Sequence, residues 1–117
     1  MTHPRPVPQL PWGWRSMWVF AMFDLPTDTP KARKAYARFR KYLLEDGFSM
    51  IQYSVYARHC ASIENAEVHM KRVGDQVPLE GEVRCLMITD RQFGRIAVYV
   101  GKKRLPKAVS PSQLELF

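Results

Sequence analysis

The chain has 117 residues, 46% of them hydrophobic, which suffices for one buried core and leaves no room for a second domain. Its 18 Lys and Arg exceed its 11 Asp and Glu, and the net charge of +7 favours a polyanionic partner such as nucleic acid. The two cysteines and three histidines lack the spacing of a disulfide framework or a zinc site, and no apolar run reaches the length of a membrane span. A cytoplasmic location is therefore expected.

Residues 1–16 are predicted to form an N-terminal arm. Their prolines remove hydrogen bonds that a helix or an inner strand needs. Trp12 and Trp14 either cover an edge of their own domain or anchor a partner. The folded domain is expected over residues 17–101, and a C-terminal arm over residues 102–117.

The apolar run from Met17 to Phe23 predicts a strand that is buried on both faces. Asp24 follows it directly, and Pro26 cannot continue a strand ladder. Asp24 should therefore lie at the carboxyl end of the strand, at the rim of the sheet, where enzymes often place functional groups. Asp24 is the first candidate for chemistry on this strand.

The next segment predicts a helix from Pro30 to about Asp46. Thr29, or alternatively Asp28, can cap its N-terminus, Pro30 suits the first turn, and Gly47 can end it. Its apolar residues recur at helical spacing and should pack on the sheet: Ala32, Ala35, Tyr36, Phe39, Tyr42 and Leu43.

Six cations occupy the same helix, with no acid before Glu45. A solvated helical face is usually mixed in sign, so this pattern favours phosphate binding over plain solvation. The predicted nucleic-acid-binding residues are Lys31, Lys34, Arg38 and Lys41 on one stripe, with Arg33 and Arg40 flanking the apolar face.

Residues 48–60 predict a second β region, in which the side-chain phase shifts near Met50 to Gln52. Because the side-chain period of a strand is 2, the shift requires either a bulge or two strands that meet at a tight bend. The sequence leaves both alternatives open, since no Asn-Gly or Asp-Gly marks a hairpin turn.

The last part of the domain predicts one helix and two strands. Ser62 can cap the helix, and Pro78 stops it. Strands follow over residues 81–89 and 96–100, joined by a linker over residues 91–95. The order strand, helix, strand pair, helix, strand, strand predicts an α+β, ferredoxin-like split βαβ fold. Such a fold has an antiparallel sheet with two helices on one face, here with an extra C-terminal strand.

Three segments together resemble a known family. They are Phe23-Asp24-Leu25-Pro26, the basic helical run over residues 33–41, and Gln52-Tyr53-Ser54-Val55-Tyr56 after Gly47-Phe48. Over residues 17–100 the chain resembles CRISPR-associated protein two, the small subunit of the spacer-acquisition complex, in the version that accompanies type II systems. The long N-terminal arm, and Tyr56 where many members carry Phe, depart from the family pattern.

The resemblance implies a ferredoxin-like homodimer in which Asp24 approaches its twofold mate and holds a divalent metal, Mg²⁺ or Mn²⁺. It also implies a role in CRISPR antiviral defence, as a subunit of the complex that acquires new spacers (CRISPR adaptation). There the dimer bridges two dimers of the integrase, CRISPR-associated protein one, and holds duplex prespacer DNA on its basic surface, with RNA as a further candidate ligand. Metal-dependent nuclease activity occurs in some members of the family and not in others, so the question of enzyme activity stays open.

Two roles compete when the residues themselves are weighed. As an endonuclease, a phosphodiester hydrolase, the chain offers Asp24 as metal ligand and catalytic residue, with Ser54 or Tyr56 to position a phosphate. As a binding scaffold, it offers the basic helix and the cluster over residues 102–104, which accounts for more of the sequence. A stand-alone metal-dependent endoribonuclease or deoxyribonuclease is the alternative function. A ferredoxin-like RNA-binding module is less favoured, because the chain lacks the aromatic motif of such readers.

Overall fold

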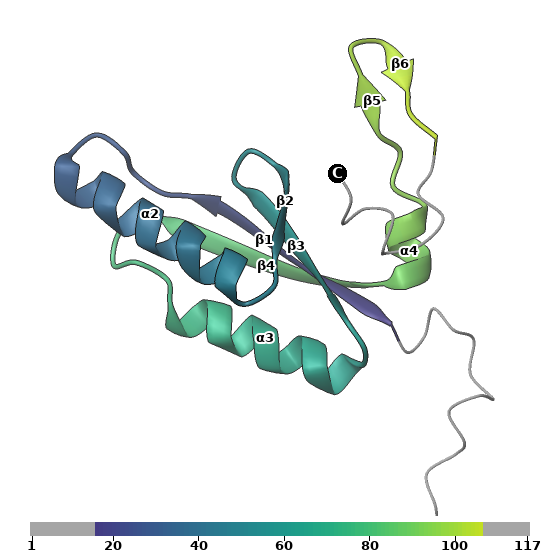
Figure 1. Cartoon of the computed structure of the whole chain (residues 1–117), viewed down its shortest axis with the longest axis horizontal. Coiled ribbons are helices and arrows are strands. Elements are labelled where there is room, and N and C mark those ends of the chain that lie inside the picture. Colours follow the sequence, from purple (N-terminus) through teal and green to yellow (C-terminus); the bar gives the residue numbers. More distant parts are fainter. Residues whose placement is uncertain (1–15, 107–117) are drawn as a thin grey trace, which may run out of the picture.

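The computed structural model describes residues 16–106, apart from the side chain of Lys103. The predictions for Trp12, Trp14 and residues 107–117 lie outside these described residues. No helix in the described part of the chain is long and apolar enough to cross a membrane. The elements are β1 (Met17–Asp24), α2 (Pro30–Glu45), β2 (Ser49–Gln52), β3 (Val55–Cys60), α3 (Ile63–Asp75), β4 (Glu82–Thr89), α4 (Asp90–Gly94), β5 (Tyr99–Val100) and β6 (Lys103–Arg104) (Figure 1).

Four strands form one antiparallel sheet in the order β2-β3-β1-β4, and α2 and α3 lie on one face of it (Figure 1). β1 is central and pairs with β3 on one side and with β4 on the other. Val19, for example, lies between Arg58 and Met87. The predicted α+β, ferredoxin-like split βαβ fold is therefore confirmed.

β1 is buried on both faces, as its apolar run predicts. Trp18 and Phe20 enter a small core on the face opposite α2 and α3, where the ring of Phe93 stacks on Trp18 with centroids 3.9 Å apart. The alternate residues of β1 enter the main core under the two long helices: Met17, Val19, Ala21 and Phe23. β1 is thus held between two layers of side chains.

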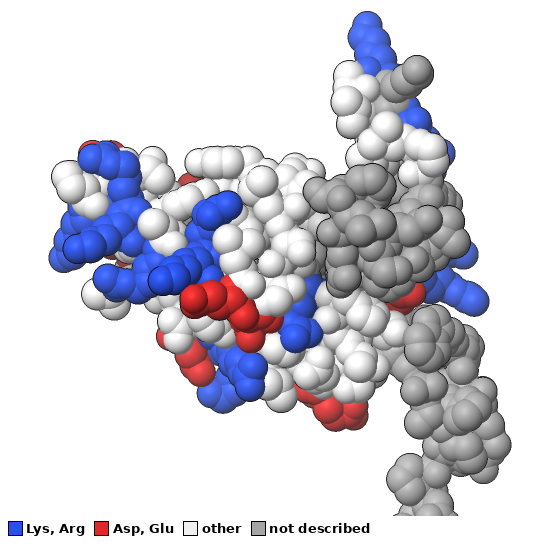
Figure 2. All heavy atoms as spheres, viewed as in Figure 1, with Lys and Arg blue, Asp and Glu red and all other residues white. Residues whose placement is uncertain are grey.

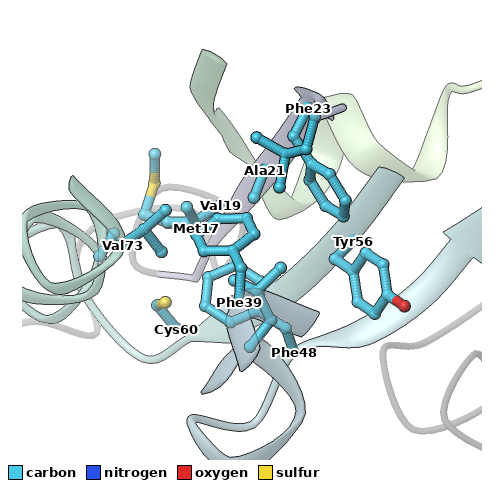
Figure 3. Packing of buried hydrophobic residues seen from close by; sticks show 12 residues of the cluster. Met17, Val19, Ala21, Phe23, Phe39, Phe48, Tyr56, Cys60 and Val73 are labelled. Atoms are coloured by element: carbon cyan, nitrogen blue, oxygen red, sulfur yellow. The ribbon is translucent and has the colours of Figure 1, made fainter. Parts of the chain in front are cut away.

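The main core joins α2 and α3 to the sheet (Figure 3). Phe39 and Leu43 of α2 and Val73 of α3 are buried, and the ring of Phe39 meets Phe23 of β1 edge-on, with centroids 5.1 Å apart. Full burial of one such side chain contributes about 1.5–3 kcal/mol. This cluster therefore holds the helices against the sheet.

α2 begins and ends where the sequence predicts. The Thr29 hydroxyl accepts a hydrogen bond from the N–H of Ala32 at 3.0 Å, which identifies Thr29 rather than Asp28 as the N-cap. Pro30 is the first helical residue. Gly47 follows the helix with a φ of 94°, a left-handed conformation that glycine adopts without strain.

The second β region contains both of the features that the sequence offered as alternatives, a tight bend and a bulge. β2 and β3 form a tight hairpin in which Tyr53 and Ser54 make the turn. The register between the strands also shifts between Met50 and Gln52, which is the bulge. Ser54 has a φ of 62°, which is uncommon for a residue other than glycine.

The prediction of a linker over residues 91–95 was wrong, because most of this segment is helical. α4 begins directly after β4, and Thr89 and Gln92 form a capping box at its start. The helix places Phe93 over Trp18. The capping signal is present in the sequence, but five residues are too few to show helical periodicity.

The extra C-terminal strand is present, but it is shorter than the predicted range 96–100. Only Tyr99–Val100 is a strand, and it pairs with β6 of the same chain. The resulting hairpin projects from the sheet (Figure 1). The pairing is extended by a hydrogen bond from Leu105 N–H to the Val98 carbonyl.

Two adjacent leucines of α2 test the packing of the core. Leu43 is 0% exposed and Leu44 is 42% exposed. Leu43→Ala should lower the free energy of unfolding by about 2–5 kcal/mol, because it leaves a cavity under the helix. Leu44→Ala, the matched control, should cost far less, within about 1 kcal/mol. Urea unfolding of both variants measures the difference, and equal losses would contradict the described packing of α2.

Candidate metal centre and nucleic-acid interface

Asp24 is the last residue of β1 and is exposed at the rim of the sheet. It shares the side of β1 that carries Trp18 and Phe20, on the face opposite the long helices. Its partner on the neighbouring strand β4 is Glu82, which is also exposed. Two carboxylates therefore lie on adjacent strands at one rim.

Gly81 holds the start of β4 close to the end of β1. A Cβ at this position would lie 2.6 Å from Leu25 Cδ2 and 2.8 Å from the Asp24 carbonyl oxygen. The φ of 99° is also unfavourable for any residue with a side chain. Glycine is therefore required here, and it fixes the spacing of the two strand ends that carry Asp24 and Glu82.

The turn between β2 and β3 lies beside the same rim. The N–H of Phe23 donates a hydrogen bond to the Ser54 carbonyl at 3.1 Å, which brings Ser54 next to the end of β1. Tyr56, by contrast, is 1% exposed and stacks on Phe23 in the main core. The fold thus brings Ser54 toward Asp24, whereas the burial of Tyr56 favours a packing role over the predicted positioning of a phosphate.

Arg84 is the cation of this rim. Its Nη2 lies 3.2 Å from Glu82 Oε1, and both side chains are exposed. Arg84 is the strand partner of Met22, so it lies on the same face as Asp24. Neither Glu82 nor Arg84 was predicted as a site residue from the sequence. Their alternation at the start of a strand indicates a shared face, but the register that joins them to Asp24 has no local signal.

The donor chemistry of the rim fits a hard divalent cation. Mg²⁺ takes oxygen ligands and keeps several waters, so one or two protein carboxylates are enough to hold it. Asp24 offers such an oxygen from an exposed position. Across residues 16–106, no three His, Cys, Asp or Glu side chains gather into a metal cage. A cation at this rim would therefore depend on few protein ligands.

Figure 2 shows Lys and Arg side chains gathered over α2. Within residues 16–106, none of the cations of this helix forms an ion pair with an acid. Arg33 donates a hydrogen bond to the Thr27 carbonyl at 3.1 Å and so helps to fix the start of the helix. All six predicted nucleic-acid-binding residues are exposed: Lys31, Arg33, Lys34, Arg38, Arg40 and Lys41. Their charge is available to a polyanion.

A cavity of about 400 Å³ lies between α2 and the segment that follows α3. Lys31, Arg38 and Tyr36 line it from α2, while Asp75 and Glu80 line it from the other side. An anionic ligand in this cavity would meet two carboxylates. The outer surface of α2 is therefore the better phosphate-binding surface: Lys34 and Lys41 lie outside the cavity lining, and Lys31 and Arg38 at its border are exposed as well.

A polar cluster at the C-terminal end of α2 was not predicted from the sequence. His69 Nδ1 lies 2.7 Å from Asp46 Oδ2, and Arg72 Nη1 lies 3.3 Å from Asp46 Oδ1. The Asp46 carbonyl accepts a further hydrogen bond from Arg58 Nε at 2.7 Å. Burial, together with the nearby Asp46 carboxylate, raises the pKa of Tyr42. The cluster ties α2 to α3 and β3, which is a structural role.

The two cysteines are structural as well. Both are free thiols, Cys60 buried and Cys85 half-buried. Burial raises the pKa of each thiol, so the reactive thiolate is disfavoured at both positions.

Together, these features define a small basic protein of split βαβ fold with a carboxylate rim and a cationic helix. Residues 17–96 match the family model of CRISPR associated protein Cas2. The match spans most of the chain, and the protein belongs to this family.

Curated relatives agree with the family model. The chain is 80% identical over 101 residues to the CRISPR-associated endoribonuclease Cas2 of Parvibaculum lavamentivorans, an alignment that covers 86% of this chain and 100% of the relative. It is 51% identical over 104 residues to the protein of the same name from Flavobacterium psychrophilum, covering 89% of this chain and 90% of the relative. A protein of the same name from Streptococcus mutans is 38% identical over 98 residues, or 84% of this chain and 90% of the relative.

Two glycines test the junction of β1 and β4. Gly81→Ala should lower the free energy of unfolding by about 1–3 kcal/mol, because the new side chain meets Asp24 and Leu25 and the backbone is left-handed. Gly74→Ala is the control: Gly74 lies in α3, and no atom lies within 4 Å of the place that a Cβ would take, so it should gain up to about 1 kcal/mol. Denaturant unfolding measures both values. A neutral Gly81→Ala would contradict the close approach of the strands.

Proposed function

We propose that this protein is the DNA-holding subunit of CRISPR adaptation. Two copies form a dimer that binds duplex prespacer DNA and bridges two dimers of the integrase, CRISPR-associated protein one. The observation that carries the proposal is the exposed cationic stripe of α2, which has no acidic partner within residues 16–106. Membership of the Cas2 family supports the link to CRISPR.

The stripe offers closely spaced positive charge to the phosphates of a duplex. Lys31, Lys34, Arg38 and Lys41 follow one another at intervals of three or four residues, so they share one face of the helix. This stretch of helix is about 15 Å long. Duplex DNA carries about nine phosphate charges over that length, so four cations can neutralise nearly half of them. Such contacts give binding that is independent of base sequence and sensitive to salt.

The proposed dimer is supported by surfaces that residues 16–106 leave open. β4 is an edge strand, and Leu86 on it is 47% exposed. The segment after α4 also exposes Val98, Tyr99 and Val100. An open strand edge and an exposed apolar segment are complementary parts of a β-addition interface. A twofold axis would pair each segment with β4 of the other subunit and place two α2 stripes on one duplex.

The cationic stripe is tested by changing Lys31, Lys34, Arg38 and Lys41 together to Ala. Duplex binding should weaken regardless of base sequence, and the salt slope of the binding constant should fall by about 1 for each phosphate that the protein no longer neutralises. Titration of a labelled duplex at several salt concentrations measures both effects.

Lys71→Ala is the matched control, because Lys71 is an exposed helical lysine that already pairs with Asp75. It should leave the affinity and the salt slope close to those of the wild type. If the fourfold variant bound the duplex with unchanged affinity, the stripe would be only a solvated surface.

A second candidate function is a metal-dependent endonuclease that acts on RNA or DNA. The exposed carboxylates of Asp24 and Glu82 favour it, and the relatives from Parvibaculum lavamentivorans and Flavobacterium psychrophilum are named endoribonucleases. Asp24 would hold Mg²⁺ or Mn²⁺, which polarises a phosphate and activates a water when bound. Ser54 lies beside the rim and would help to position the phosphate.

An RNA-binding module of the ferredoxin-like class has less support. Such modules stack bases on exposed aromatic side chains of the central strands. Here Trp18 and Phe20 are buried, because Phe93 of α4 covers them. β1 therefore presents no stacking platform.

Asp24→Asn separates metal chemistry from DNA holding, because it removes the ligand with little change of shape. If Asp24 holds the cation, Mg²⁺ or Mn²⁺ should raise the melting temperature of the wild type and leave that of the variant unchanged. The variant should be at least as stable as the wild type without metal and should lose any nuclease activity. Spacer integration with the integrase should persist. Thermal scans with and without metal, run beside nuclease and integration assays, measure these outcomes.

Asp28→Asn is the matched control, since Asp28 is an exposed acid in the loop after β1 and should behave as the wild type. Full nuclease activity in Asp24→Asn would assign cleavage to another site. Loss of integration while DNA binding persists would contradict the scaffold role.

A further inference from the structure

We infer that Glu82 is a second ligand of the cation at Asp24, supplied by the same chain, and that Arg84 binds the phosphate beside it. The inference rests on the proposed metal site and deepens it. It extends that site from one carboxylate to two carboxylates and a guanidinium, all on one face of β1 and β4.

The strand register places the two carboxylates side by side. Asp24 and Glu82 are directly opposite each other in the antiparallel pair of β1 and β4. Opposite residues on one face of such a pair have Cβ atoms about 4.5–5.5 Å apart, and like charges at these positions repel. Both side chains are exposed, so a cation can reach them. A divalent cation with oxygen ligands would turn this repulsion into shared coordination.

Gly81 makes the arrangement rigid. Its Cβ position would lie 2.8 Å from the Asp24 carbonyl oxygen and 3.0 Å from Leu25 Cα, so the two backbones are in close contact immediately before Glu82. The distance between the strand ends is therefore set by backbone packing. Ligands held on rigid elements in this way need little reorganisation when they bind.

Arg84 supplies a positive charge beside Glu82 at the rim. Its guanidinium pairs with Glu82 at 3.2 Å, and both partners are exposed. Exposed pairs of this kind are weak, so a divalent cation can replace the guanidinium at small cost. Arg84 would then be without its carboxylate partner, and its planar donor groups suit a phosphate oxygen. Cation binding and phosphate binding would thus be coupled at the rim.

The inference predicts different effects for two substitutions in the full chain. Mn²⁺ binding is measured by titration, from the electron paramagnetic resonance signal of unbound Mn²⁺. Glu82→Gln, which preserves shape, should weaken Mn²⁺ binding at least about tenfold. Arg84→Gln should not weaken it, because that variant removes a competing positive charge. Mn²⁺ should also raise the affinity of the wild type for a short oligonucleotide, and Arg84→Gln should lose most of that increase.

Glu80→Gln is the matched control, because Glu80 is an exposed acid of the same segment that lies outside the strand pair. Glu82→Ala removes the same carboxylate by a different substitution. Circular dichroism verifies that each variant is folded. If both Glu82 variants bind Mn²⁺ as tightly as Glu80→Gln while Asp24→Asn does not, the role of Glu82 is overturned and the site at Asp24 stands. If Asp24→Asn binds Mn²⁺ like the wild type, the proposed metal site itself fails. Weaker Mn²⁺ binding by Arg84→Gln would overturn the role given to Arg84.

Discussion

Burial of β1 on both faces is the constraint on which the rest of the structure depends. The long helices cover one face through Phe39 and Leu43, and α4 covers the other through Phe93. A strand held between two cores cannot slide, because a shift of one residue would exchange its two sets of side chains. The point where its apolar run stops is therefore fixed in space. Asp24 occupies that point, opposite Glu82 at the start of β4, and β3 starts nearby at Val55, opposite Met22.

The proposed dimer would use several surfaces of the single chain. β4 has an open edge, and the segment around Val98 has exposed apolar side chains within the described residues. One cationic stripe on α2 covers about 15 Å, a short stretch of duplex. A twofold axis would join the open edge to the apolar segment and double the stripe. It would also repeat the carboxylate rim. Our central claim is that the chain is one half of such an assembly.

Local signals in the sequence predict the elements well, whereas contacts between distant segments are not predictable from them. The end of β1 at Asp24 and the caps of α2 depend on a few adjacent residues, and the structure has them where the sequence indicates. The pairing of Asp24 with Glu82 depends on strand register, which is set by the packing of the whole sheet. The buried pair of His69 and Asp46 likewise joins distant segments. Short elements such as α4 were missed because five residues contain too little periodicity.

The solution mass of the protein at micromolar concentration tests the central claim most directly. Sedimentation equilibrium should give twice the chain mass of 13.6 kDa for the wild type. Val98→Asp places a charge in the proposed interface and should give the mass of one chain. Val68→Asp, at an exposed position of α3, is the control and should remain a dimer. A wild-type mass of one chain at these concentrations would contradict the account.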